Sequence, residues 1–297
     1  MSEREPDLSI DRNTLSGFDS PELPRPGRGE PEVVVASAPE DVAALAAERI
    51  AASLVAAVER RGRADFCTTG GSTPVPIYRL LARTPLCDSI PWASVHVWWG
   101  DDRFVRRGDP ESNVTSLDAV LLGGDGGDAG APLPRMNVHP VPTDLALAGL
   151  HDNAWCAAKY AEEMSGVLPI GPGNWPTFDL ILVGVGDDGH VLSCFPHSPT
   201  LQRWDWVMGV PAPTHIGPHL DRVTINPRML EASPLMVVTT GARKAEALGR
   251  IFGDAADFDT SPTGLRMELW PAARTRRAGA VWIVDEAAAT GIPKRLR

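Results

Sequence analysis

The sequence predicts an α/β protein with a Rossmann-like layered fold, in which helices flank a mainly parallel central sheet. Short apolar runs rich in β-branched residues recur along the chain without alternating with polar residues, which is typical of strands buried on both faces. Segments with helical spacing separate these runs, as expected for strands that alternate with helices. Glycines, acids and bases follow several runs directly, which places polar groups where buried strands end.

The composition of the chain limits the classes of function. With 297 residues, 43% of them hydrophobic, it is long enough for one large α/β domain or two ordinary ones. The formal net charge of −10 argues against nucleic acid as a partner, because binding the phosphate backbone needs a basic face. No apolar run is long enough to span a membrane and the N-terminus has no apolar signal core, so we expect a cytoplasmic protein without a membrane partner.

The four cysteines are scattered along the chain, and their spacing does not indicate a metal site. We therefore expect free thiols in a reducing cytoplasm, and no metal. The sequence also contains neither a dinucleotide fingerprint of the Gly-x-Gly-x-x-Gly type nor a Gly-Lys-Ser/Thr phosphate loop. No cofactor is expected.

Residues 1–30 are polar and rich in Pro, Gly, Arg and Glu, so we predict a disordered tail. Residues 31–297 are predicted to form a single α/β domain. Its first helix is predicted to begin with a capping box made by Ser37 and Glu40, and to end at Gly62. Apolar residues at a spacing of four give this helix one buried face: Val42, Ala46, Ile50, Leu54 and Val58.

The other elements continue the alternation of strands and helices. Strands are predicted at 32–36, 64–69, 94–99, 138–141, 180–185, 221–225, 234–240 and 281–285. Further helices are predicted at 74–81, beyond residue 113, and at 151–165, 227–232, 242–248 and 286–289. Residues 123–134 are predicted to be a surface loop, and residues 203–220, with two tryptophans and several prolines, an irregular excursion.

The run from Leu180 to Val185 ends in Gly186-Asp187-Asp188-Gly189-His190. Glycines let the backbone turn sharply and approach a ligand closely. Because ligands of open α/β sheets bind outside the carboxyl ends of the strands, His190 is a candidate active-site residue; a hydrogen-bonded histidine in a polar loop is the alternative. Asp188 belongs to the Asp-Gly-His motif, whereas Asp187 is interpreted as part of the turn only.

Three further strand ends carry groups that suit a phosphorylated ligand. Gly70-Gly71-Ser72-Thr73 precedes a helix and offers N–H groups and hydroxyls to a phosphate, although a plain turn has the same composition. Asp101 and Arg103 follow a strand, where a structural ion pair is the alternative. Lys244 falls in the first turn of a helix, where a cation opposes the helix dipole and an anionic ligand explains it better. If the strands are parallel, all these ends meet at one edge of the sheet.

Taken in order, these segments resemble the 6-phosphogluconolactonases, over about residues 31–290. Several spaced motifs in the same order are far more specific than any one of them. The matching motifs are Gly70-Gly71-Ser72-Thr73-Pro74, Trp99-Gly100-Asp101-Asp102-Arg103 with Asp109-Pro110-Glu111-Ser112-Asn113, Gly184-Val185-Gly186-Asp187-Asp188-Gly189-His190 with Ser193 and Phe195-Pro196, and Gly241-Ala242-Arg243-Lys244-Ala245. That family is related in fold to the glucosamine-6-phosphate deaminases. One departure is Asp102, where the family usually has glutamate.

The resemblance implies hydrolysis of 6-phospho-D-glucono-1,5-lactone to 6-phosphogluconate in the oxidative pentose phosphate pathway, without a cofactor or metal. A histidine that titrates near neutrality suits the activation of water, so His190 is the expected general base. Asp188 would orient its ring, and Arg103 would stabilise developing charge or bind the phosphate. The expected substrate-binding residues are Gly70, Gly71, Ser72, Thr73, Asp101, Asn113, Arg222 and Lys244.

Two other functions stay open on the sequence. One is a sugar-phosphate deaminase or isomerase on the same fold, and the other is a non-catalytic sugar-phosphate-binding protein. The presence of His190 and the lack of an attached DNA-binding module favour an enzyme. Arg222 opens a strand and could equally form a surface ion pair. The partner expected is a phosphorylated sugar lactone, and the expected assembly is a monomer or a weak homo-oligomer.

Overall fold

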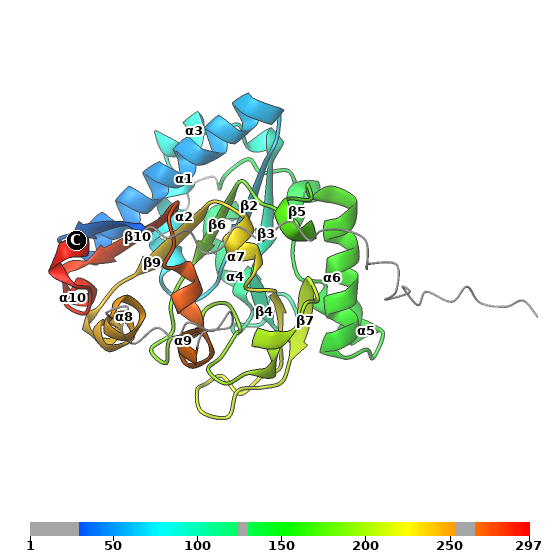
Figure 1. Ribbon diagram of the computed structural model, residues 1–297. Helices are drawn as coiled ribbons and strands as arrows, with labels where there is room; N and C mark the ends of the chain where they lie inside the picture. Colours follow the sequence, from blue (N-terminus) through cyan, green and yellow to red (C-terminus); the bar gives the residue numbers. More distant parts are fainter. Residues whose placement is uncertain (1–29, 124–129, 254–264) are drawn as a thin grey trace, which may run out of the picture.

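A central sheet of parallel strands organises the computed structural model, which describes residues 30–123, 130–253 and 265–297 (Figure 1). Every neighbouring pair of strands in this sheet is parallel. In spatial order the seven strands are β1 (Glu32–Ala36), β10 (Ala280–Asp285), β9 (Leu235–Thr239), β6 (Leu180–Val183), β2 (Ala64–Thr68), β3 (Val95–Trp99) and β5 (Val138–His139). The predicted fold class is confirmed, and β6, which leads to His190, is the middle strand.

A second, antiparallel sheet adjoins the first and consists of β4 (Asp101–Arg103), β8 (Arg222–Ile225) and β7 (Val207–Val210). It adds to one prediction and corrects another. Asp101 and Arg103 follow β3, as predicted, and they form a short strand of their own. The excursion at 203–220 is not wholly irregular, because it contains β7, whose Val207, Met208 and Val210 are buried.

The helices cover the sheets. The longer ones are α1 (Pro39–Arg61), α2 (Pro74–Leu81), α6 (Asn153–Val167) and α8 (Ala245–Phe252). The shorter ones are α3 (Leu86–Ser89), α4 (Asn113–Leu117), α5 (Thr143–Ala148), α7 (Met229–Ala232), α9 (Leu265–Leu269) and α10 (Glu286–Ala289). Helix α1 contacts β2, β6 and β10, and α6 packs against the strands of the second sheet, as Figure 1 shows.

Helix α1 bears out the predicted apolar face but not the predicted capping box. Its residues Val42, Ala46, Ile50 and Leu54 are fully buried and Val58 is half-buried. The N-cap is Ala38, which makes no side-chain hydrogen bond. Pro39 begins the helix because its fixed φ suits the first turn, and this leaves Ser37 one residue too early to cap it.

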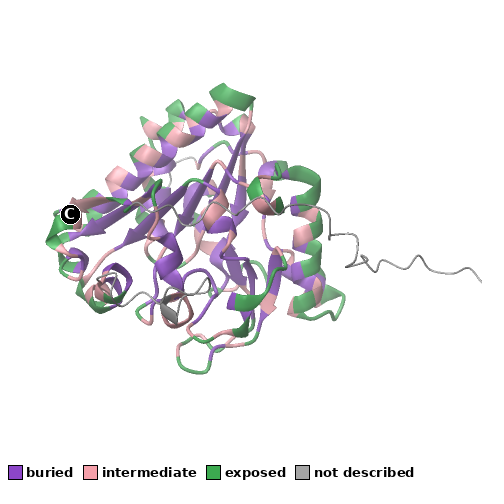
Figure 2. Cartoon of the chain, viewed as in Figure 1, coloured by how far each residue is buried: buried purple, intermediate pink, exposed green. Residues whose placement is uncertain are grey.

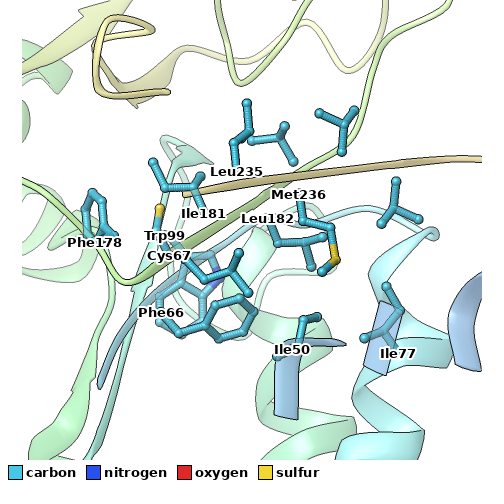
Figure 3. Close-up of a cluster of buried hydrophobic side chains, with 14 of the residues drawn as sticks. Ile50, Phe66, Cys67, Ile77, Trp99, Phe178, Ile181, Leu182, Leu235 and Met236 are labelled. Carbon is cyan, nitrogen blue, oxygen red and sulfur yellow. The ribbon is translucent and has the colours of Figure 1, made fainter. Parts of the chain in front are cut away.

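The core lies between the central sheet and the helices that cover it. Figure 2 shows the inner strands of the central sheet buried along most of their length, with exposed residues on the outer faces of the helices, whereas the edge strand β1 is only partly buried. In Figure 3, Ile50 of α1 and Ile77 of α2 lie near Phe66 of β2 and Leu182 of β6. Fully burying one such side chain contributes about 1.5–3 kcal/mol to the free energy of unfolding.

Some predictions fall partly or wholly outside the described residues. The predicted tail is residues 1–30, of which 1–29 lie outside, and the predicted surface loop at 123–134 lies outside at 124–129. Within the described part of the chain, no helix is long and apolar enough to cross a membrane. All four cysteines are free, as predicted, and three of them are buried.

Candidate active site

The carboxyl ends of β2, β6 and β9 meet β4 and β8 around a cavity of about 260 Å³. This arrangement follows from the parallel sheet, since these three strands are neighbours and end at the same edge. The structure brings together at this cavity most of the residues predicted for the site: Gly70, Gly71, Ser72, Thr73, Asp101, Arg103, Asn113, His190, Arg222 and Lys244. Asp188 is not part of the lining, and it contacts the site through His190.

The turn after β6 fixes the ring of His190. Its Nδ1 lies 2.5 Å from Asp188 Oδ1, and its backbone N–H donates to the same oxygen at 3.1 Å. A Cβ on Gly186 would lie 2.0 Å from that ring nitrogen, so the close approach requires glycine. Because a carboxylate accepts hydrogen bonds, Nδ1 carries the proton and Nε2 is the nitrogen left for a substrate or water.

Asp188 is held by more than His190. Burial opposes its ionisation, but hydrogen bonds from His190 and His215 outweigh burial and hold the pKa of Asp188 well below its ordinary value. Asp188 is therefore a carboxylate at neutral pH. The sequence reasoning assigned no role to His215, which lies in a proline-rich loop with no motif to mark it.

Asp101 and Asn113 form a buried polar wall of the cavity. Asp101 accepts a hydrogen bond from Ser193 Oγ at 2.6 Å and one from Asn113 Nδ2 at 3.3 Å. Asn113 also donates to the backbone carbonyl of Asp101 at 2.8 Å. Its side chain packs so closely on Gly70 that a Cβ there would lie 2.0 Å from Asn113 Oδ1. The alternative of an ion pair between Asp101 and Arg103 is therefore not what the structure shows.

Two arginines face each other across the antiparallel ladder. Arg103 of β4 is the register partner of Arg222 of β8. Arg103 donates to the Glu111 carbonyl at 2.5 Å, and Arg222, which is only 5% exposed, donates to the carbonyls of Leu220 and Pro218. Burial lowers the pKa of Arg222, and the positive charge of Arg103 adds to this effect. Arg222 is thus a buried cation at the cavity rather than half of a surface ion pair.

Lys244 lies at the end of the single-turn 3-10 helix Ala242–Lys244 that precedes α8. Its Nζ is 2.6 Å from Asp187 Oδ1, and both residues line the cavity. The interpretation of Asp187 as part of the turn only is therefore wrong. Sequence spacing gave no sign of this pair, because β6 and β9 bring the two residues together from positions far apart in the chain.

Asp102 lies beneath the cavity wall and is fully buried. It accepts hydrogen bonds from the backbone N–H groups of Arg103 and Asn113 and from Ser112 Oγ. Burial raises the pKa of this carboxyl to about 7, and the three donors only partly offset the effect of burial. Asp102 thus positions the Ser112-Asn113 backbone from below, on a side chain shorter than the glutamate of the family pattern.

Replacing Asp102 with asparagine is expected to make stability less dependent on pH. The raised pKa means that the folded state binds the proton more tightly than the unfolded chain. The stabilising contribution of Asp102 is therefore fully present below about pH 4 and lost as the pH rises to about 7, by up to about 1.4 kcal/mol per pH unit. Thermal unfolding followed by circular dichroism over this range should show a steeper fall for wild type. Parallel curves for the two proteins would contradict this account.

The fold and the cavity define a class of protein. A parallel α/β sheet carries, at its carboxyl edge, a histidine–carboxylate pair beside three cations and a glycine-rich turn, which suits acid–base chemistry on a small phosphorylated molecule. Among the described residues, no group of three or more His, Cys, Asp or Glu is arranged to hold a metal ion.

Comparison with known proteins narrows the class to a family. The family model described as glucosamine-6-phosphate isomerases/6-phosphogluconolactonase matches residues 37–282, and the chain belongs to this family. A 6-phosphogluconolactonase from Synechocystis is 34% identical over 78% of this chain and 86% of its own length. Another, from Streptomyces coelicolor, is 32% identical over 90% of this chain and 96% of its own length.

Solved structures agree with the fold. The 6-phosphogluconolactonase from Trypanosoma brucei superposes with a TM-score of 0.72 at 24% identity, covering 89% of this chain and 99% of its own. A monomeric glucosamine-6-phosphate deaminase superposes with a TM-score of 0.62 at 17% identity, covering 90% of this chain and 100% of its own. At these identities the likeness concerns the fold alone.

Proposed function

We propose that this chain hydrolyses 6-phospho-D-glucono-1,5-lactone to 6-phospho-D-gluconate in the oxidative pentose phosphate pathway, with His190 activating the water. The curated relatives that match most of the chain at 32–34% identity carry the name 6-phosphogluconolactonase, which supports a lactonase. The observation that carries the proposal is the His190–Asp188 pair at a cavity lined by three cations.

His190 is placed to act first as base and then as acid. With Nδ1–H bonded to Asp188, Nε2 takes a proton from water while the water oxygen attacks the lactone carbonyl carbon. The tetrahedral oxyanion then collapses, the bond from that carbon to the ring oxygen breaks, and the ring oxygen receives the proton from His190. Asp188 stabilises the imidazolium between the two transfers without becoming protonated itself.

The cations would stabilise two different negative charges, the phosphate of the substrate and the oxyanion of the tetrahedral intermediate. Lys244 and the Gly70–Thr73 turn lie on either side of the end of β6 and would hold the phosphate, which the turn receives at the N-terminus of α2. Arg103 and Arg222 lie on the second sheet and would stabilise the oxyanion. Asp101 and Asn113, held in place by each other, would accept and donate hydrogen bonds to sugar hydroxyls.

The rate of lactone hydrolysis above the spontaneous background tests this function. Purified protein is mixed with freshly generated 6-phosphogluconolactone, and 6-phosphogluconate formation is followed with a coupling dehydrogenase. We expect a rate that scales with protein concentration and saturates with lactone. Ammonia release from glucosamine 6-phosphate without lactone hydrolysis would identify a deaminase instead, and binding of 6-phosphogluconate without either reaction would identify a non-catalytic binding protein.

We also propose that residues 31–297 form a single domain and that the protein works in the cytoplasm as a monomer or a weak homo-oligomer. One hydrophobic cluster that runs from Ala36 to Ile292 supports the single domain. The free state of all four cysteines supports a reducing compartment.

A further inference from the structure

Asp188 is shared by two histidines, and the proposed mechanism uses only one of them. Its Oδ1 contacts His190 Nδ1 at 2.5 Å, and its Oδ2 contacts His215 Nε2 at 2.8 Å. A carboxylate can only accept, so His215 donates Nε2–H to it. The side chain of Asp188 is 18% exposed, and that of His215 is 48% exposed.

His215 belongs to the segment 211–221, which joins β7 to β8. This segment is braced internally by a hydrogen bond from the Ala212 N–H to Asp221 and by one between His219 and the Pro213 carbonyl. Ile216, the next residue after His215, lines the cavity. The contact between His215 and Asp188 therefore connects the segment 211–221, which contributes Ile216 to the cavity, with the turn that holds the proposed base.

The ring of Phe195 packs against the rings of both His190 and His215. Its ring lies 4.9 Å from the ring of His190 and 5.8 Å, edge to face, from the ring of His215. The guanidinium of Arg222 lies 5.9 Å from the same ring. His215 is thus packed as well as hydrogen-bonded, which argues against a chance surface contact.

We propose that His215 is a positioning residue for the reaction: by bonding Asp188 Oδ2, it holds the carboxylate in the orientation that presents Oδ1 to His190. This inference rests on the proposed lactonase function and adds to it. Without the second bond, Asp188 is held only through Oδ1, by the ring and the backbone N–H of His190, so the carboxylate and the His190 ring are less firmly oriented towards the attacking water.

The second bond also tunes the charge that His190 meets. A hydrogen bond from His215 draws negative charge away from Oδ1, so losing it makes Asp188 a stronger partner for the imidazolium form of His190. The acid limb of the pH profile should then move to higher pH, because more base is protonated at a given pH. The other charged groups that line the cavity do not change in the variants below: Asp101, Arg103, Asp187, Arg222 and Lys244.

Two variants separate the hydrogen bond from the packing. His215→Phe keeps a ring against Phe195 and removes the donor, whereas His215→Gln keeps an N–H donor near the position of Nε2. For His215→Phe we expect kcat to fall about 10-fold or more, with a smaller change in KM and an acid limb moved to higher pH. His215→Gln should recover most of the loss and the wild-type pH profile.

Each outcome decides the proposal. Equal activity and equal pH profiles for wild type and His215→Phe would overturn it, as would an equal loss in both variants with the pH profile unmoved. If His215→Phe does not fold, the His190 ring is observed by NMR in two other variants, His215→Gln and His215→Asn. The amide of asparagine is one methylene shorter than that of glutamine and does not reach Asp188. An unchanged signal from the His190 ring in both variants would overturn the proposal. A wild-type protein without lactonase activity would refute the proposed function. An active wild type whose activity and pH profile are the same in His215→Phe would refute this inference alone.

Discussion

Replacing His190 with glutamine is expected to lower kcat for lactone hydrolysis by about 10²–10⁴-fold, with little change in KM. Glutamine can still donate a hydrogen bond to Asp188, but it can neither accept a proton from water nor deliver one to the ring oxygen, so the acid–base contribution is lost while the hydrogen bond to Asp188 is kept. Initial rates at saturating lactone, corrected for spontaneous hydrolysis, measure the effect.

The matched control is His151→Gln, because His151 is exposed and stacks on Trp155 away from the residues that line the cavity. That variant should keep wild-type rates. A His190→Gln enzyme that hydrolyses the lactone as fast as wild type would refute the mechanism, even though the family assignment would stand.

Replacing Lys244 with methionine should raise KM for the lactone by about 10- to 100-fold and leave kcat nearly unchanged. A charge-assisted hydrogen bond to phosphate contributes about 1.5–3 kcal/mol, and that contact exists equally in the bound substrate and the transition state. Inhibition by 6-phosphogluconate, measured alongside KM, should weaken by a similar factor because the product carries the same phosphate.

Asp187 provides the complementary change. Asp187→Asn removes the carboxylate that lies 2.6 Å from Lys244 Nζ, so the cation is no longer neutralised and KM should fall. Arg250→Met is the control, because Arg250 is an exposed cation of α8 that is not among the residues lining the cavity. If Lys244→Met instead loses kcat at constant KM, Lys244 stabilises developing charge and a different group holds the phosphate.

The sequence allowed the central sheet to be predicted because its strands carry a local signal. A continuous run such as Leu180–Val183 is buried on both faces, and this property is visible without knowing its neighbours. Strand β7, Val207–Val210, was missed because Gly209 interrupts its apolar run and tryptophans and prolines surround it in the sequence. Its pairing with β8 depends on contacts that no local pattern records.

The residues of the candidate site were likewise predictable only in part. His190 and Lys244 could be singled out because each follows a strand, and a parallel sheet gathers such positions at one edge. The residues that contact these groups could not be predicted from strand ends. Asp187 pairs with Lys244, which follows another strand, and His215 reaches Asp188 from the segment between β7 and β8. Long-range packing determines these contacts, so they became visible only in three dimensions.

The central position of β6 in the sheet determines how partial unfolding would affect the site. Sheets open first at their edges, and here the edges are β1 and the two-residue β5, several strands away from β6 on either side. Most residues of the cavity lie at the ends of β9, β6 and β2 or in the segments that follow them, and these three strands are paired on both sides. Fraying of the outer strands should therefore leave the carboxyl ends of β9, β6 and β2 intact. Backbone amides of β6 should exchange with deuterium only when the whole domain unfolds, and therefore at the rate of global unfolding.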